Sequence, residues 1–410
     1  MCTMSTPKVI IAGCGIAGPV LAVFLKLKGY EPVIYERLSG PENVGLALGL
    51  QPNGLRVLSL IPGLVDKIDG KALDSFTFYS VIPEDKGFLV QFDLPSEIRE
   101  FHGNNTMCVR RPTFHQTLVE VAEMHGVKIV WGHQLVSLEQ RDDSVLVGFA
   151  NGFTDTASFV IGCDGLHSDT RVCLFGKEKP EFTGLTQVGG ISPKPESFNR
   201  ATMTNVYGDG AHMIHFPVND EQIAWAITQR EEEAKETWRH MDEKLQNEFK
   251  ESGPCSEWSF GCSELVKSAE TIVKYGLYDR PELASWHKGR VALLGDAAHP
   301  TSPHLGQGAN QAFEDIYHLV RLLVKYNPSA ASPSTDVLHT VFSEYEAVRI
   351  SRTSMLVKEA RRRGENRVVH GTEACKKRNE KTRETWKNNG AVTKGFHERY
   401  SHPFVGNSEI

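Results

Sequence analysis

The chain begins with a short apolar run, a glycine-rich turn and a longer stretch with helical spacing. Residues 9–12 form a β-branched run that ends at glycine, which is typical of a strand buried on both faces of a parallel sheet. Residues 16–28 carry a helical pattern that stops at Gly29, and Pro19 falls in the first turn, where its missing N–H costs no hydrogen bond. Residues 32–35 predict a second strand. This order predicts a βαβ unit and an α/β fold.

Later segments alternate between the two periodicities. The apolar pattern predicts helices over 53–60, 112–125 and 307–326, and after a Pro-, Ser- and Ala-rich linker at 327–335 another over 337–363. It predicts strands over 127–130, 159–161, 222–228 and 289–295, with antiparallel strands within 73–93. Residues 231–250 are predicted to be helical. A hairpin is predicted from 144–150 and 153–157, joined by Asn151-Gly152 in a type I′ turn.

Composition and charge narrow the class of protein. The 410 residues are 40% hydrophobic and 23% charged, with a net charge of −6, which argues against a general nucleic-acid binder. The eight cysteines form no CxxC or Cys/His cluster, which favours reduced thiols in the cytoplasm over a disulfide framework or a metal site. The apolar stretch 9–27 is interrupted by three glycines and Pro19, so no membrane span is expected.

The C-terminal part is basic. Residues 358–399 contain thirteen Lys and Arg against six Asp and Glu, about +7. We interpret this as a solvated helical face supported by pairs such as Glu359 with Arg363. Binding of an anionic surface or a nucleic acid is the alternative.

The turn after the first strand carries the motif Gly13-Cys14-Gly15-Ile16-Ala17-Gly18, followed by Glu36 at the end of the second strand. Gly13 permits a tight turn, Gly15 lets the backbone approach a pyrophosphate, and Gly18 lets helix and strand pack closely. The helix N-terminus would face the phosphates, and Glu36 could accept the ribose hydroxyls. The motif predicts a dinucleotide site and leaves FAD and NAD both open.

Two further blocks decide between them. The first spans residues 160–168 and includes Asp164-Gly165; the second spans 289–300 and includes Gly295-Asp296. With the glycine motif, they occur in the order and spacing of class A flavoprotein monooxygenases, the group of 4-hydroxybenzoate and salicylate hydroxylases, which the chain resembles over residues 8–325. The resemblance implies a Rossmann-type FAD domain with an inserted β-sheet substrate domain and a helical C-terminal tail. It divides the chain into an FAD domain (1–72, 101–180, 281–326), a substrate domain (73–100, 181–280) and a helical region (327–410).

The resemblance also assigns residues to FAD. Asp296 follows a buried strand at a tight turn, where its carboxylate could accept a ribityl hydroxyl, although capping of a helix would explain it too. The N-terminus of the helix that begins near 307 would face the pyrimidine edge of the flavin. Arg110 resembles the arginine that reaches the pyrophosphate. The complete expected FAD set is Gly13, Gly15, Gly18, Glu36, Arg37, Ala47, Gly49, Arg110, Asp164, Gly165, Asp296, Gly306, Gly308, Ala309 and Asn310.

The implied chemistry is a hydroxylation. NADH or NADPH would reduce FAD, O2 would form a flavin C4a-hydroperoxide, and its electrophilic oxygen would attack a phenol or hydroxybenzoate. Decarboxylative hydroxylation and epoxidation of an alkene stay open. Pro303, His215 and Tyr207 are the candidate catalytic residues: Pro303 by resemblance, and the other two because they fall on strands expected to line the pocket. His167 and His299 are interpreted as structural.

Other classes of protein fit less well. A flavin disulfide reductase needs a CxxC pair, and a flavin halogenase carries a WxWxIP segment; the sequence contains neither. A non-enzymatic nucleotide-binding protein is the remaining alternative, supported only by the basic tail. We expect a monomer or homodimer with a small aromatic or alkene substrate and O2 as partners.

Overall fold

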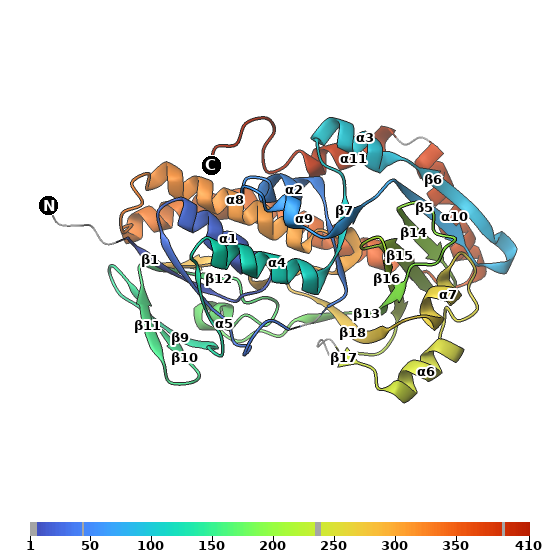
Figure 1. Ribbon diagram of the computed structural model, residues 1–410, viewed down its shortest axis with the longest axis horizontal. Helices are drawn as coiled ribbons and strands as arrows, with labels where there is room; N and C mark the ends of the chain where they lie inside the picture. The colour runs from blue at the N-terminus through green and yellow to red at the C-terminus, as the bar shows by residue number, and fades with distance from the viewer. Residues whose placement is uncertain (1–5, 43–44, 234–238, 388–389) are drawn as a thin grey trace.

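The computed structural model describes residues 6–42, 45–233, 239–387 and 390–410. Two halves lie side by side (Figure 1). The left half contains a mainly parallel sheet covered by helices, and the right half contains a large, mainly antiparallel sheet.

The six-stranded sheet of the left half has the order β19-β20-β12-β1-β2-β8. All its pairings are parallel except that of β19 with β20. The apolar residues of β1 are at most 3% exposed, as expected for a parallel strand covered on both faces. The strands are β1 (Lys8–Ala12), β2 (Glu31–Tyr35), β8 (Lys128–Val130), β12 (Phe159–Gly162), β19 (His287–Lys288) and β20 (Val291–Leu293).

Helices and two small sheets complete this half. The helices are α1 (Ala17–Leu27), α2 (Pro52–Leu58), α4 (Arg111–Met124), α5 (Asp169–Phe175) and α8 (Gly308–Tyr326), with 3-10 turns η1 (Val65–Lys67), η3 (Gly295–Ala297) and η4 (Pro303–Leu305). One small sheet has the order β3-β7-β4 and the other β11-β10-β9. Their strands are β3 (Ala47–Leu50), β4 (Gly70–Ala72), β7 (Met107–Arg110), β9 (Leu135–Gln140), β10 (Val145–Phe149) and β11 (Thr154–Ala157).

The eight-stranded sheet of the right half has the order β17-β18-β13-β16-β15-β14-β5-β6. Two separate stretches of the chain build it: β5 (Ser75–Ser80) and β6 (Gly87–Phe92), joined through η2 (Pro83–Asp85), and then β13 to β18. These later strands are β13 (Glu181–Pro193), β14 (Thr202–Tyr207), β15 (Ala211–Pro217), β16 (Gln222–Arg230), β17 (Arg239–His240) and β18 (Thr271–Asp279).

The two faces of this sheet have different neighbours. We call the face that carries Gly189 the inner face, because it packs against the left half of the molecule. A Cβ on Gly189 would lie 2.3 Å from Cδ1 of Leu46, the residue just before β3. The outer face carries Val188, Met213 and Trp225, which pack with the helical segment around Cys262. Helices α6 (Glu243–Ser252) and α7 (Cys262–Lys267) lie on this outer face, whereas α3 (Leu94–His102) packs against Phe76 and Phe92 of β5 and β6.

Three C-terminal helices connect the halves: α9 (Thr335–Arg367), α10 (Thr372–Lys387) and α11 (Gly390–Tyr400). The side chain of Ser334 caps α9 by accepting a hydrogen bond from the backbone of Val337. The 33 residues of α9 run along α8 and continue toward the large sheet (Figure 1). The expected helical tail is present, and most Lys and Arg side chains of its basic stretch 358–399 are exposed or half-buried; Arg367 and Arg378 are the buried exceptions.

Three local predictions were wrong. The hairpin loop has positive φ at Gly152 but not at Asn151, and Phe149 and Phe153 still pair, so a three-residue loop replaces the type I′ turn. Residues 231–233 are not helical, 234–238 lie outside the described residues, and the helix starts only at Glu243, where Asp242 caps it. Glu359 pairs with Arg362 rather than with Arg363.

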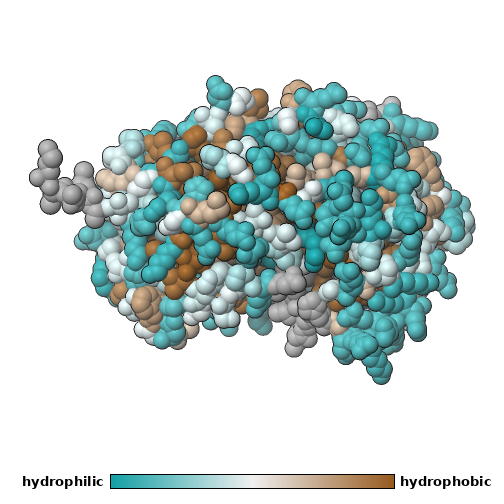
Figure 2. All heavy atoms as spheres, in the orientation of Figure 1, coloured by the Kyte–Doolittle hydropathy of each residue, from teal (hydrophilic) through white to brown (hydrophobic). Residues whose placement is uncertain are grey.

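The surface differs between the halves. On the face drawn in Figure 2, hydrophilic residues dominate the right half, whereas apolar residues are visible between the helices of the left half. Among the described residues, no helix is long and apolar enough to cross a membrane.

Candidate active site

The turn between β1 and α1 has the geometry that the glycine motif predicts. Gly13 has φ +102°, and a Cβ there would lie 2.5 Å from the carbonyl oxygen of Cys163. A Cβ on Gly18 would lie 2.1 Å from the carbonyl oxygen of Gly13, so helix and turn pack in direct backbone contact. A Cβ on Gly15 would meet nothing within 4 Å. The turn therefore leaves open space at the N-terminus of α1, where a pyrophosphate fits.

Glu36 closes the other side of this turn. Its carboxylate accepts hydrogen bonds from the backbone of Cys14 at 2.7 Å and of Leu38 at 3.0 Å. This places a buried carboxylate at the end of β2, beside the glycine turn, where ribose hydroxyls can reach it. Arg37 is exposed.

Asp296 lies on the η3 turn directly after β20, which Gly295 permits with φ +63°. Its side chain is exposed and makes no hydrogen bond or ion pair with any described residue. Enclosure by the surrounding chain raises its pKa, while His299 and Arg111 oppose this rise. A carboxylate that solvent can reach and that has no hydrogen-bond partner among the described residues is suited to accept hydrogen bonds from hydroxyl groups of a ligand.

The two adjacent arginines take different directions. Arg110 lies at the end of β7 and donates to Gln222 Oε1 of the large sheet at 3.3 Å. Arg111 begins α4, lies against Gly45 and interacts electrostatically with Asp296. Of the two, Arg111 is therefore the arginine that interacts with Asp296, and the expected FAD contact of Arg110 stays a prediction.

Asp164 holds its own loop together. It accepts hydrogen bonds from the Ser168 hydroxyl at 2.5 Å and from the backbone and hydroxyl of Thr170, both at 2.9 Å. Gly165 follows with φ +76°. Arg280 supports the same loop by donating to the carbonyl oxygen of Leu166. The side chain of Asp164 therefore shapes the loop beside the FAD turn.

The N-terminus of α8 is tied to the segment after β3. Asn310 is fully buried, donates to the carbonyl oxygens of Gly49 at 2.9 Å and Gly306 at 2.8 Å, and accepts from the backbone of Gln51. Its amide is thus fully used within the protein. Gly308 keeps the helix start open toward Asp296, since a Cβ there would lie 3.9 Å from Asp296 Oδ1. Ala309 and Ala47 are half-buried on either side.

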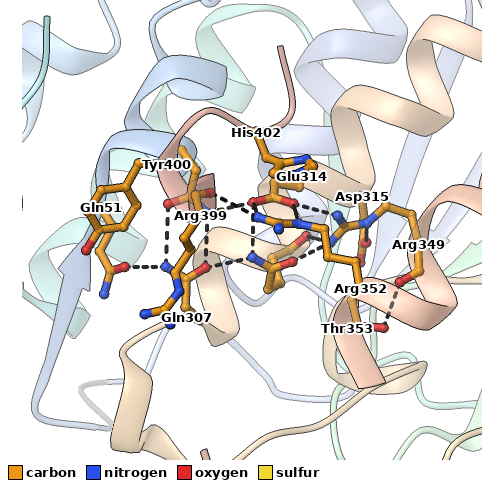
Figure 3. Close-up of polar contacts among 12 residues, drawn as sticks. Gln51, Gln307, Glu314, Asp315, Arg349, Arg352, Thr353, Arg399, Tyr400 and His402 are labelled. Carbon is orange, nitrogen blue, oxygen red and sulfur yellow. Dashed lines mark hydrogen bonds and ion pairs between the residues drawn. The ribbon is translucent and has the colours of Figure 1, made fainter. Parts of the chain in front are cut away.

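A buried ionic network lies behind this helix (Figure 3). Arg349 of α9 donates to Glu314 Oε2 at 2.5 Å and to Asp315 Oδ1 at 2.7 Å, and Arg352 also donates to Glu314. Asp315 in turn accepts from the backbone of Gly295 at 3.0 Å. Burial alone would raise the pKa of Glu314, but Arg349 and Arg352 outweigh it and hold that pKa well below its usual range. The network fixes the Gly295-Asp296 turn to α8 and α9.

His299 belongs to the same support, because its Nε2 lies 2.6 Å from Asp315 Oδ2. This agrees with the structural interpretation of His299. His167 is exposed.

A row of polar side chains crosses the inner face of the large sheet. Cross-strand pairing places five buried residues at one level on neighbouring strands, each at most 8% exposed. Gln187 donates to Thr228 at 3.2 Å and accepts from the hydroxyl of Tyr275. We call this set the polar row; its members are Tyr207, His212, Thr228, Gln187 and Tyr275. Polar groups take the place of the usual apolar core here, which makes the polar row a candidate site.

His212 is the titratable centre of the polar row. Its Nε2 lies 3.1 Å from Asn205 Oδ1, and because that oxygen can only accept, Nε2 carries the proton and Nδ1 is a bare acceptor. Nδ1 has no partner among the described residues. Burial, reinforced by Arg367, His304 and further cations, lowers the pKa of His212 well below its usual value.

The three expected catalytic residues are not brought together. Tyr207 belongs to the polar row, with its ring 5.0 Å from that of His212. Pro303 is exposed on η4 beside the start of α8. His215 is on the outer face: it stacks on Phe198 and its Nε2 lies 3.1 Å from the carbonyl oxygen of Phe260. Burial lowers its pKa to about 4. His215 therefore lies on the opposite face of the sheet from the polar row, and its catalytic role stays a prediction.

Known proteins share both sequence and fold with this chain. Curated relatives include 3-amino-4-hydroxybenzoate 2-monooxygenase of Streptomyces cremeus, 29% identical over 383 residues that cover 92% of each chain. Another is 6-hydroxynicotinate 3-monooxygenase of Pseudomonas fluorescens, 29% identical over 360 residues that cover 85% of this chain and 89% of the relative. The crystal structure of Klebsiella pneumoniae HpxO complexed with FAD and uric acid has the same fold, with TM-score 0.82, 21% identity and 97% coverage of both chains.

The Rossmann-type sheet, the open glycine turn and the Asp296 carboxylate, which has no partner among the described residues, fit a dinucleotide cofactor. Residues 6–360 match the family described as "FAD binding domain", and the chain belongs to that family. Together with the relatives, this makes it a class A flavoprotein monooxygenase, an FAD-dependent enzyme. The predicted fold class, cofactor and enzyme class are confirmed.

Proposed function

We propose that the protein hydroxylates an electron-rich aromatic ring of the phenol or hydroxybenzoate type, bound between η4 and the inner face of the large sheet. The observation that carries this proposal is the polar row, a buried set of proton donors and acceptors on the face that meets the FAD half. The names of the relatives agree with it, since they are monooxygenases of amino- and hydroxybenzoates and of a hydroxynicotinate.

We propose FAD contacts in three places. Gly13, Gly15 and Gly18 shape the pyrophosphate turn, and Glu36 and Arg37 lie at the ribose end. Asp296 and Arg111 reach the middle of the cofactor, with Asp164 and Gly165 in the neighbouring loop. Ala47, Gly49, Gly306, Gly308, Ala309 and Asn310 shape the recess for the ring system at the start of α8. When bound, FAD supplies electron transfer from NADH or NADPH and the activation of O2.

His212 would accept a hydrogen bond from the substrate hydroxyl at Nδ1. Asn205 holds the imidazole in the tautomer that leaves this atom bare. The cations that lower the pKa of His212 lower the pKa of a phenol bound beside it as well, so they favour the electron-rich phenolate. Tyr207, covered by Arg378 at 4.5 Å from its ring centroid, positions the imidazole from the side.

Pro303 is proposed to lie at the border between substrate and cofactor, because it starts the turn that leads from His304 to the start of α8. The described cysteines are free, which supports a reducing, cytoplasmic setting. Within the proposal the enzyme is a monomer or homodimer.

Anaerobic stopped-flow absorbance with NADH and NADPH tests this function. Purified protein should carry FAD, and a hydroxybenzoate or related phenol should accelerate bleaching of the flavin band. Absence of bound flavin, or reduction that no aromatic compound in the panel accelerates, would contradict the proposal.

A further inference from the structure

The polar row meets a buried arginine with a histidine beside it at the C-terminal end of α9. Arg367, the last residue of α9, is 6% exposed, and His304 of η4 is 4% exposed. Arg367 Nη1 lies 3.0 Å from His304 Nδ1. His212 of the polar row feels both groups electrostatically. We call Arg367 together with the neutral imidazole of His304 the cation cluster; its positive charge is that of Arg367.

The cation cluster has no counter-charge within the described part of the chain. The charged groups that act most strongly on Arg367 are Arg363, which is positive, and the phenol of Tyr207. No described carboxylate forms an ion pair with Arg363 or Arg367. Burial lowers the pKa of Arg367 to about 10, so the guanidinium stays protonated at neutral pH. A buried cation without an anion is costly and is normally paired.

Hydrogen-bonding capacity is also unused. Arg367 Nε and His304 Nε2 are buried and have no partner among the described residues. Because a guanidinium only donates, His304 Nδ1 must accept from Arg367, and its Nε2 then carries a proton. Gly364 makes room for this imidazole, since a Cβ there would lie 2.5 Å from His304 Nε2. The pair thus offers donors and positive charge, and no acceptor directed at a ligand.

We infer that Arg367 and His304 form the subsite for a permanent anion of the substrate, the carboxylate of an aromatic acid, supplied by the C-terminal helix and the turn before α8. This inference rests on the proposed function, because the subsite adjoins the polar row. It assigns the two ends of the substrate: the carboxylate to the cation cluster, and the ring hydroxyl to the polar row. A planar guanidinium is suited to a carboxylate because it can donate two parallel hydrogen bonds.

Binding to the oxidised holoenzyme tests this inference without turnover. Salicylate, 3-hydroxybenzoate and 4-hydroxybenzoate are titrated against the matching amides, with the change in flavin absorbance and calorimetry as readouts. The amides keep the ring, the hydroxyl and the size but lack the charge. At least one acid should bind about 10- to 100-fold more tightly than its amide, as expected for hydrogen bonds to charged groups.

The matched variants are Arg367→Met, Arg367→Lys and Arg362→Met. Arg367→Met should abolish the preference for the acid and leave binding of the amide nearly unchanged, and Arg367→Lys should keep part of the preference. Arg362→Met makes the same substitution on an exposed face of α9 and should keep the full preference. Thermal unfolding of ligand-free Arg367→Met should occur at or above the wild-type temperature, because an uncompensated charge is removed.

The inference is overturned if no acid is preferred over its amide, if the preference survives in Arg367→Met, or if ligand-free Arg367→Met unfolds earlier than wild type. The FAD content and the NAD(P)H-dependent hydroxylation of the same preparations separate this failure from that of the proposed function. An enzyme that holds FAD and hydroxylates neutral phenols without preferring acids would retain the function and lose the anion subsite.

Discussion

One helix carries two buried arginines in opposite electrostatic settings. Arg349 of α9 meets Glu314 and Asp315, and its hydrogen bonds reach both carboxylates and Gln311. Among the described residues, Arg367 at the end of the same helix has one side-chain hydrogen-bond partner, the imidazole of His304, and its Nε has none. The first cluster is balanced in charge and saturated with hydrogen bonds, so it serves as scaffold. The second cluster is neither balanced in charge nor saturated with hydrogen bonds, so we assign its missing partner to a ligand. Both clusters contain a buried arginine, and only the presence or absence of a counter-charge distinguishes them.

The largest expected effect concerns the polar row. His212→Gln removes the bare imidazole nitrogen while it keeps polarity and similar volume. We expect kcat to fall by about 10²- to 10⁴-fold, the usual contribution of a positioned acid or base. Turnover of the best aromatic substrate, with FAD content and substrate affinity measured on the same samples, checks this. An unchanged kcat would show that His212 has a packing role in the polar row and no role in catalysis.

The balanced network around Arg349 is expected to contribute a similar free energy, but to the stability of the fold rather than to kcat. Arg349→Met leaves Glu314 and Asp315 buried without their main counter-charge, which costs about 3–5 kcal/mol of unfolding free energy. Denaturant unfolding measures it, with Arg362→Met as the exposed control that should change stability by less than about 0.5 kcal/mol. A loss in Arg349→Met no larger than that of Arg367→Met would erase the difference between the two clusters.

The pH dependence of stability sharpens the same contrast. Despite their burial, Arg349, Arg352 and His299 hold the pKa values of Glu314 and Asp315 below their usual values, so the folded state binds fewer protons than the unfolded state. Their contribution is present above the unfolded pKa values of about 4 and is lost as pH falls through the lower folded values. The unfolding free energy of wild type should therefore fall more steeply below about pH 5 than that of Arg349→Met. Equal slopes would contradict this.

The smallest effect is expected on the outer face. His215→Phe replaces a neutral imidazole that stacks on Phe198, and kcat should stay within about threefold of wild type, because the residue is remote from the inner face. A decrease as large as that of His212→Gln would mean that the assignment of the two faces is reversed.

The FAD half of the fold follows from local sequence, because its glycines and β-branched runs are determined by close neighbours. Gly13, Gly18 and Gly295 are required by contacts or positive φ that the motif already implies. The start of the helix expected over 231–250 was wrong, because the polar residues do not show where the helix begins; the cap at Asp242 is the signal that was overlooked.

The substrate side depends on tertiary packing and could not be predicted. His212 and His215 are three residues apart on β15 and therefore face opposite sides, and both faces of this strand mix polar and apolar residues. Nothing local tells which side meets the FAD half. Arg110 and Arg111 lie at a strand-to-helix junction, and the sequence likewise does not show which of them points toward Asp296 and which toward the large sheet. Arg367 looked like part of a solvated tail until α9 placed it against η4.

Turnover under ¹⁸O₂ with mass spectrometry of the products tests the central claim most directly. The account predicts that a hydroxylated aromatic product carries one ¹⁸O atom, that NAD(P)H consumption matches its formation, and that His212→Gln uncouples the two. If every phenol and aromatic acid of the panel gives only hydrogen peroxide and unlabelled substrate, the protein is not an aromatic hydroxylase acting through this site.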